Sequence, residues 1–217
     1  MNNRVEYKME CRVLAAWPQK DLTETIESWL GGLAGVTRYG SLTPNPVKDV
    51  RRFWKCVSNG HWGLLEHGGA TCLLKCNRGV THELVRHRLC SYLQESTRYR
   101  AYEEDGIVLR SVSFPDALKP VEEYAERVAR QYRELLEKGA SRDEARHILP
   151  NCLEASVVVT ANWRQWLHIL VTRTGKGVHP DMAATMREVE TALYGVWPDL
   201  NWVLRVYSDG WGELLHE

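Results

Sequence analysis

Residues 86–100, RHRLCSYLQESTRYR, concentrate side chains that can bind an anion. These fifteen residues include four arginines, one histidine and two serines, but only one carboxylate. Guanidinium groups bind phosphate and carboxylate through paired hydrogen bonds, and they repel one another unless an anion lies close to them. The composition of this basic segment therefore predicts an anionic binding partner.

Three kinds of partner are compatible with the basic segment. Its arginines can pair with carboxylates elsewhere in the protein, as charged side chains do on most surfaces. They can instead bind nucleic-acid phosphates while Tyr92 and Tyr99 stack on bases. A third possibility is a small phosphorylated ligand, with Ser91, Ser96 and Thr97 as neutral hydrogen-bonding groups. Residue spacing alone leaves these alternatives open.

The overall charge argues against a general nucleic-acid binder. The 217-residue chain contains 28 lysines and arginines and 28 aspartates and glutamates, so its formal net charge is zero and any basic patch must be local. The N-terminal sequence MNNRVEYKMECRV is polar and alternating, and no apolar run approaches the length of a bilayer span. We therefore expect a cytoplasmic protein, a single domain over residues 1–217, with no membrane or nucleic-acid partner.

The six cysteines do not indicate a disulfide framework, because their spacings are not paired. His67, Cys72, Cys76 and His82 could in principle surround a zinc ion. Cys72 and Cys76 lie in an apolar run that is typical of a buried strand, which argues against a structural zinc site at these residues. We therefore expect free thiols and no metal site.

The periodicity of apolar residues predicts strands at 5–13, 70–76 and 153–159. A short helix that begins at Asp21 is predicted to end at the glycines of GGLAG, which we interpret as a turn. Further helices are predicted at 46–58, 81–88, 120–138, 141–149 and 162–173, with a last one from Asp181. The basic segment is predicted to be a loop or a helix end. Strands and long helices without regular alternation favour an α+β fold with a mixed, largely antiparallel sheet.

The order of residues in the basic segment is similar to one known family. RHRLCSYLQESTRY matches the R-H-R-x7-S signature of flavin-dependent thymidylate synthases. HWGLLEH, at 61–67, resembles the H-x-S/T-x-x-E-H segment of that family, and ANWRQWLHILVTR, at 161–173, resembles its second half. The resemblance covers residues 60–195 and favours a small phosphorylated ligand over the other two partners.

The resemblance implies an enzyme that methylates dUMP to dTMP. It implies FAD as cofactor, NADPH and methylenetetrahydrofolate as co-substrates, and a homotetramer whose active sites are shared between subunits. The residues that it assigns to dUMP are Glu83, Arg86, Glu95, Ser96, Thr97, Arg98, Arg146 and Arg173. Those that it assigns to FAD are His61, Gly63, Arg86, His87, Arg88, Glu95, Asn162, Arg164 and His168.

Arg173 is the residue expected to act in catalysis, because the matching arginine of the family faces the uracil ring. Cys90 is expected to have no catalytic role, and Ser96 is expected to bind ligand because nothing near it in the sequence would activate its hydroxyl. Gly63, Glu83, Cys90 and His168 differ from the residues that are common at these positions of the family. The alternative function is a module that binds nucleotides or single-stranded nucleic acid and lacks redox activity.

Overall fold

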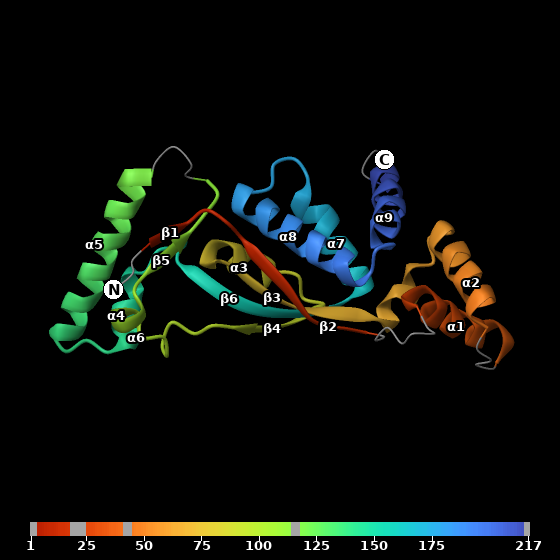
Figure 1. The fold of residues 1–217 in the computed structure, drawn as a ribbon, viewed down its shortest axis with the longest axis horizontal. Helices are drawn as coiled ribbons and strands as arrows, with labels where there is room; N and C mark the ends of the chain where they lie inside the picture. The colour runs from red at the N-terminus through yellow and green to blue at the C-terminus, as the bar shows by residue number, and fades with distance from the viewer. Residues whose placement is uncertain (1–3, 18–24, 41–44, 114–117, 215–217) are drawn as a thin grey trace.

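The structure is a computed structural model that describes residues 4–17, 25–40, 45–113 and 118–214 (Figure 1). Its central element is a four-stranded antiparallel sheet in the order β2-β3-β6-β4. The bounds of these strands are Glu10–Trp17, Gly69–Asn77, Glu154–Asn162 and Cys90–Gln94. A parallel pair, β1 (Arg4–Glu6) and β5 (Val108–Arg110), lies at one end. The α+β fold with a largely antiparallel sheet is thus confirmed.

Two helices cover one face of this sheet, α7 (Trp163–Thr174) and α8 (Pro180–Val196) (Figure 1). Alternate residues of β3 and β6 are buried against them, among them Cys72, Leu74 and Val157. The indole of Trp166 on α7 donates a hydrogen bond to the carbonyl oxygen of Ala70 at 3.1 Å. This hydrogen bond fixes α7 directly on strand β3.

In the middle of the strands, the residues of the opposite sheet face are half-buried or exposed within one chain. Leu73 and Val158 are half-buried on this face, whereas Leu14 and Leu93 are 44% and 75% exposed. The hydroxyl groups of Thr71 and Thr160 lie 2.9 Å apart across the two central strands on the same face. We call this the open face of the sheet.

The two ends of the sheet carry separate helical groups. At one end, α1 (Ile26–Tyr39) packs on α2 (Pro46–Ser58), beside the short helix η1 (Trp62–His67) and α9 (Leu200–Leu214). At the other end, a second hydrophobic cluster is built around the parallel strands. Its helices are α4 (Tyr102–Asp105), α5 (Leu118–Glu137), α6 (Arg142–Ala145) and η2 (Arg146–Ile148). A single domain over 1–217 stays a prediction.

The structure corrects three predictions about these elements. The predicted first helix falls partly outside the described residues, and α1 begins at Ile26 and continues through the GGLAG glycines to Tyr39. Glycine is required at position 31 of this helix, because α2 lies so close that a Cβ there would overlap the backbone of Asp49. The predicted strand 5–13 is interrupted between β1 and β2, and α9 follows the helix that we expected to be the last.

The basic segment is also not simply a loop, because it contains the edge strand β4. Alternate side chains of β4 point to the helices or to the open face, so Tyr92 is half-buried whereas Leu93 is exposed. The sequence does not reveal this alternation of half-buried and exposed side chains, because the edge strand contains polar residues among its apolar ones. The helix before it, α3 (Arg78–Leu84), begins and ends earlier than the predicted 81–88.

Candidate active site

Arg173 makes two hydrogen bonds that connect α7 to the region around α3. Its Nε donates to Nε2 of His87 at 3.0 Å, and its Nη1 donates to Oε2 of Glu83 at 3.2 Å. Glu83 lies on α3, and His87 follows the end of that helix. We call Arg173, Glu83 and His87 the arginine clamp. The clamp joins three residues that the sequence analysis assigned separately to dUMP and FAD.

His87 is held in place through its backbone. Its amide nitrogen donates to the carbonyl oxygen of Leu84 at 3.0 Å, and its carbonyl oxygen accepts from the hydroxyl group of Tyr92 at 2.9 Å. Its ring and the ring of His168 form a T-shaped contact, with the two centroids 5.8 Å apart. The strand β4 and the helix α7 therefore both determine where this imidazole lies.

The imidazole of His87 is neutral at physiological pH. Burial, the charge of Arg173 and the neighbouring His168 lower the pKa of His87 to about 4. Because Nε2 accepts a hydrogen bond from Arg173, the single ring proton of this neutral form must be on Nδ1. Burial and then Arg173 also lower the pKa of His168. The charge on Arg173 is thus the positive charge that dominates this part of the site.

A second group of predicted residues surrounds a small cavity of about 200 Å³. The cavity is lined by Arg78, Thr97, Arg146, His147 and Leu149. Two guanidinium groups and a hydroxyl group around so small a volume form a suitable environment for a phosphate. We call it the phosphate cavity, and it brings together Thr97 and Arg146, two of the residues that the resemblance assigns to dUMP.

The sequence analysis missed Arg78 and His147 as lining residues of this cavity. Arg78 is the first residue of α3, where the helix dipole is unfavourable for a cation. A cation at a helix N-terminus is therefore a sequence signal for a nearby anion, once the helix is known to begin at residue 78. Asn77 is the N-cap of α3, because its side chain accepts from the amide of Val80 at 2.9 Å. This cap fixes the start of the helix at residue 78.

Three further predicted dUMP residues of the basic segment, Glu95, Ser96 and Arg98, have protein partners. Glu95 accepts from Arg100 at 2.5 Å and from the amide of Ser156 at 3.2 Å, so it attaches the segment to β6. Arg98 forms an exposed ion pair with Asp143 at 2.7 Å. The hydroxyl oxygen of Ser96 accepts from the amide of Arg98 at 3.3 Å. These contacts fix the turn that follows β4.

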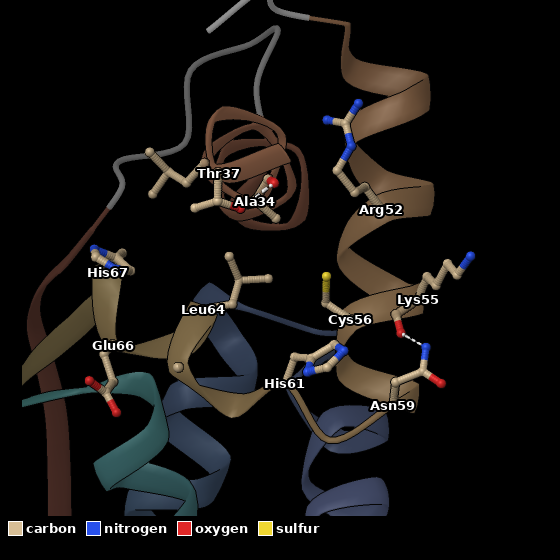
Figure 2. A pocket seen from close by; sticks show the side chains of 12 residues that line it. Ala34, Thr37, Arg52, Lys55, Cys56, Asn59, His61, Leu64, Glu66 and His67 are labelled. Carbon is tan, nitrogen blue, oxygen red and sulfur yellow. Dashed lines mark hydrogen bonds between the residues drawn. The ribbon is translucent and has the colours of Figure 1, made fainter. Parts of the chain in front are cut away.

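A larger cavity of about 730 Å³ lies between α1, α2 and η1 (Figure 2). Its lining residues are Leu33, Ala34, Thr37, Arg52, Lys55, Cys56, Asn59, His61, Gly63, Leu64, Glu66 and His67. Apolar groups such as Leu64 and Ala34 face the hollow together with the imidazoles of His61 and His67 (Figure 2). A Cβ added to Gly63 would have no atom within 4 Å, so the glycine leaves this wall open. Two of the predicted FAD residues, His61 and Gly63, thus line one cavity.

Helix α7 connects this large cavity to the arginine clamp. Asn162 caps the start of α7 by accepting from the amide of Gln165 at 2.8 Å. Arg164, in the first turn, pairs with Glu66 of η1 at 2.5 Å. Arg173 lies nine residues further on, which is about 14 Å along a helix axis. The predicted FAD residues of α7 therefore extend between the two groups and do not form one cluster.

Arg86 and Arg88 are exposed, and within the described part of the chain neither makes an ion pair. The arrangement thus leaves two cations of the R-H-R sequence available for a ligand or another subunit. Among the described residues there is also no group of three or more side chains that could hold a metal ion. Burial raises the pKa of Cys76 to about 12 and raises that of Cys90, and such protonated thiols are poor metal ligands and poor nucleophiles.

Comparison with known proteins places this geometry in a family. Residues 32–199 match the family model described as thymidylate synthase complementing protein. A flavin-dependent thymidylate synthase of Geobacter sulfurreducens is 34% identical over 160 residues, which cover 71% of this chain and 69% of the relative. One of Corynebacterium glutamicum is 32% identical over 196 residues, 77% of this chain and 76% of the relative. The chain belongs to the family of flavin-dependent thymidylate synthases.

The fold also occurs in a solved structure. The crystal structure of the UMP/dUMP methylase PolB from Streptomyces cacaoi, bound with 5-Br dUMP, superposes with a TM-score of 0.77. The match covers 93% of this chain and 96% of PolB at 18% sequence identity, so it shows a shared fold. In the part of the chain that the structure describes, no helix has both the length and the apolar character needed to cross a bilayer.

Proposed function

We propose that this protein methylates dUMP to dTMP, with methylenetetrahydrofolate as the one-carbon donor and NADPH as the reductant of bound FAD. Membership of the flavin-dependent thymidylate synthase family supports this proposal. The observation that carries it is the arginine clamp, which presents a guanidinium group fixed by two hydrogen bonds, together with a separate cavity suited to phosphate. A pyrimidine nucleotide offers one group to each of them, the oxygen acceptors of its ring to the guanidinium group and its phosphate to the cavity.

The residues around the large cavity fit a flavin. Its volume of about 730 Å³ lies within the range of cofactor pockets, its wall is open at Gly63, and it combines apolar groups with polar ones. His61 and Gly63 would hold the cofactor there, and Asn162 and Arg164 would hold it at the start of α7. When bound, FAD would supply the hydride that completes the methyl group.

The protein's own side chains would bind and orient dUMP. Arg78, Arg146 and Thr97 would hold its phosphate, because the two guanidinium groups can donate paired hydrogen bonds to phosphate oxygens. Arg173 would donate to O2 of the uracil ring and stabilise the negative charge that develops when C5 becomes nucleophilic. None of the clamp residues lines the phosphate cavity, which favours a nucleotide that is bound by more than one subunit.

The open face of the sheet supports the proposed homotetramer. A monomer would leave Leu14 and Leu93 in water, together with the unpaired edge of β4. Burial of such apolar groups drives association. Arg86 and Arg88 both lie just before β4 in the chain. An adjoining subunit at this edge, or a ligand shared with it, would meet these two cations. We therefore propose active sites that are shared between chains.

Subunit mixing tests the shared sites. Arg88→Ala and Arg173→Lys would each strongly reduce the activity of the homotetramer. If a site takes Arg88 from one chain and Arg173 from another, a mixed tetramer would contain some sites that lack both substitutions. We expect dTMP formation to return when the two proteins are exchanged, with exchange verified by native mass spectrometry of differently tagged chains. Verified exchange without recovered activity would contradict shared active sites.

Ser96→Ala is expected to weaken dUMP binding without stopping turnover. Ser96 adjoins Thr97 of the phosphate cavity, and its hydroxyl group, whose oxygen accepts from the amide of Arg98, can still donate its hydrogen to a phosphate. The loss of one hydrogen bond to a charged phosphate costs about 1.5 to 3 kcal/mol, so the dissociation constant should increase about 10- to 150-fold. Titration calorimetry and steady-state kinetics at saturating dUMP would measure the two effects. If the variant stays inactive at saturating dUMP although its FAD is bound and reducible, the assignment of Ser96 to ligand binding is wrong.

The absorbance spectrum and dTMP formation provide the direct test of the proposed function. We expect purified protein to be yellow or to take up added FAD, to lose its flavin absorbance with NADPH, and to form dTMP once dUMP and methylenetetrahydrofolate are added. A protein that takes up no FAD but binds single-stranded nucleic acid with a steep salt dependence would instead be the redox-inactive binding module.

A further inference from the structure

We propose that Glu83 and His87 are positioning residues that hold the guanidinium group of Arg173 in a single orientation toward the substrate. This inference depends on the proposed methylation of dUMP and deepens it. It gives these two residues a role through Arg173 that differs from direct contact with dUMP or FAD. The contacts of the clamp carry the inference in three steps.

The first step is the number of donors that the clamp leaves available. A guanidinium group has five N–H donors in one plane. His87 receives the Nε donor and Glu83 receives one Nη1 donor. The two contacts lie at different nitrogens, so they fix both the position and the plane of the group. The two donors on Nη2 and one on Nη1 are then left for a ligand.

The second step is that His87 is suited to accept. Its neutral ring, with the proton on Nδ1, presents the Nε2 lone pair to Arg173. An imidazolium would have no lone pair and would repel the guanidinium group. Tyr92 holds the backbone of His87, and the His87 ring packs against His168. The acceptor is therefore itself fixed by β4 and α7.

The third step concerns the energy of the Glu83–Arg173 pair. The two side chains are 40% and 24% exposed. Partly exposed ion pairs contribute little to folding stability, so the pair is not required for the fold. Its geometric effect is larger, because small displacements of a catalytic group cause large losses of rate. Variants of Glu83 are therefore expected to fold and to show their effect in catalysis.

A double-mutant cycle on the full-length, FAD-loaded protein tests the inference. The variants are Glu83→Ala, Arg173→Lys and the double variant, with Glu83→Gln as the conservative replacement. We expect Glu83→Ala to lower the single-turnover rate at saturating dUMP by about 10- to 100-fold. Glu83→Gln should retain most of the rate, because its amide oxygen can still accept from Nη1. In the Arg173→Lys background, Glu83→Ala should change the rate by less than about threefold.

Independent action would give a different result in this cycle. If the effects of Glu83→Ala and Arg173→Lys multiply, Glu83 acts without Arg173 and the inference is wrong. The matched control is Glu103→Gln, because Glu103 pairs with Arg142 at similar exposure, 24% and 38%, on the α4 and α6 side of the molecule. This control should leave the rate unchanged.

A measurement without turnover separates this inference from the proposed function. Histidine labelled with ¹⁵N, observed by NMR in the parent protein at neutral pH, should show His87 neutral, with a protonated Nδ1 and an unprotonated Nε2. The opposite tautomer or an imidazolium would overturn the clamp even if dUMP is methylated. The expected tautomer in a protein that forms no dTMP would refute the proposed function while the geometry of the clamp stands.

Discussion

Replacing Arg173 with lysine is expected to slow methylation at saturating dUMP by about 100- to 1000-fold, the loss typical when one preorganised transition-state donor is removed. Lysine keeps the positive charge but presents a single ammonium instead of a planar fork. It therefore cannot contact His87, Glu83 and the uracil ring in the geometry of the clamp. Reduction of FAD by NADPH, measured by flavin absorbance, should change little.

A structural role for Arg173 predicts a much smaller effect. Arg173 lies in the last turn of α7, where a cation stabilises the helix dipole by about 0.3 to 1 kcal/mol, and lysine would preserve that contribution. Arg142→Lys is the matched control, since Arg142 donates to Glu103 from both Nε and Nη2, away from the clamp. If Arg173→Lys methylates dUMP at the parent rate, Arg173 has no catalytic role.

The elements that sequence predicted well are those with local signals at their ends. Pro46 follows the N-cap Asn45 at the start of α2, and Ser141 forms the predicted capping box with Glu144. The predicted cap Asn162 begins α7. The apolar run at 70–76 became β3 because its alternate residues are buried beneath α7 and α8. For the three helix starts the decisive contacts lie within a few residues of one another, and for β3 the alternation of apolar residues is itself the local signal.

The elements that sequence predicted poorly depend on distant neighbours. Glycine weakens an isolated helix, but the glycines of α1 allow α2 to approach closely, a contact that only the tertiary structure reveals. The edge strand β4 carries polar residues because only one of its sides pairs, with β6. Local propensity in both places gives the wrong element, since packing overrides it.

The candidate site likewise combines residues that the sequence identified with contacts that only the folded structure shows. Family resemblance identified Arg173, Glu83 and His87 individually, but their contacts join positions 86 and 90 residues apart in sequence. Spacing gives no information on such contacts, because they depend on the last turn of α7 meeting the end of α3 in the folded chain. The phosphate cavity likewise combines Arg78 with Thr97 and Arg146, and it was only partly predicted.

A buried ion pair joins the two hydrophobic clusters of the fold. Arg110 on β5 is 1% exposed, and its Nε and Nη2 donate to Oε2 of Glu154 on β6 at 2.8 and 2.6 Å. Its Nη1 donates to the carbonyl oxygen of Lys8, in the segment between β1 and β2. Glu154 is 6% exposed. Arg110 thus connects the parallel strands to the main sheet at a point that excludes water.

Glu154→Ala is therefore expected to lower the free energy of unfolding by about 3 to 5 kcal/mol, because it leaves the Arg110 charge buried without its main partner. Urea denaturation at one fixed protein concentration would measure this loss, since association makes apparent stability depend on concentration. The control is Glu6→Ala, which removes an exposed pair with Arg4 and should cost no more than about 1 kcal/mol. The double variant Arg110→Met/Glu154→Leu should recover part of the loss, because it removes the unpaired charge together with its former partner. If Glu154→Ala unfolds at the parent urea concentration, the pair does not hold the two clusters together.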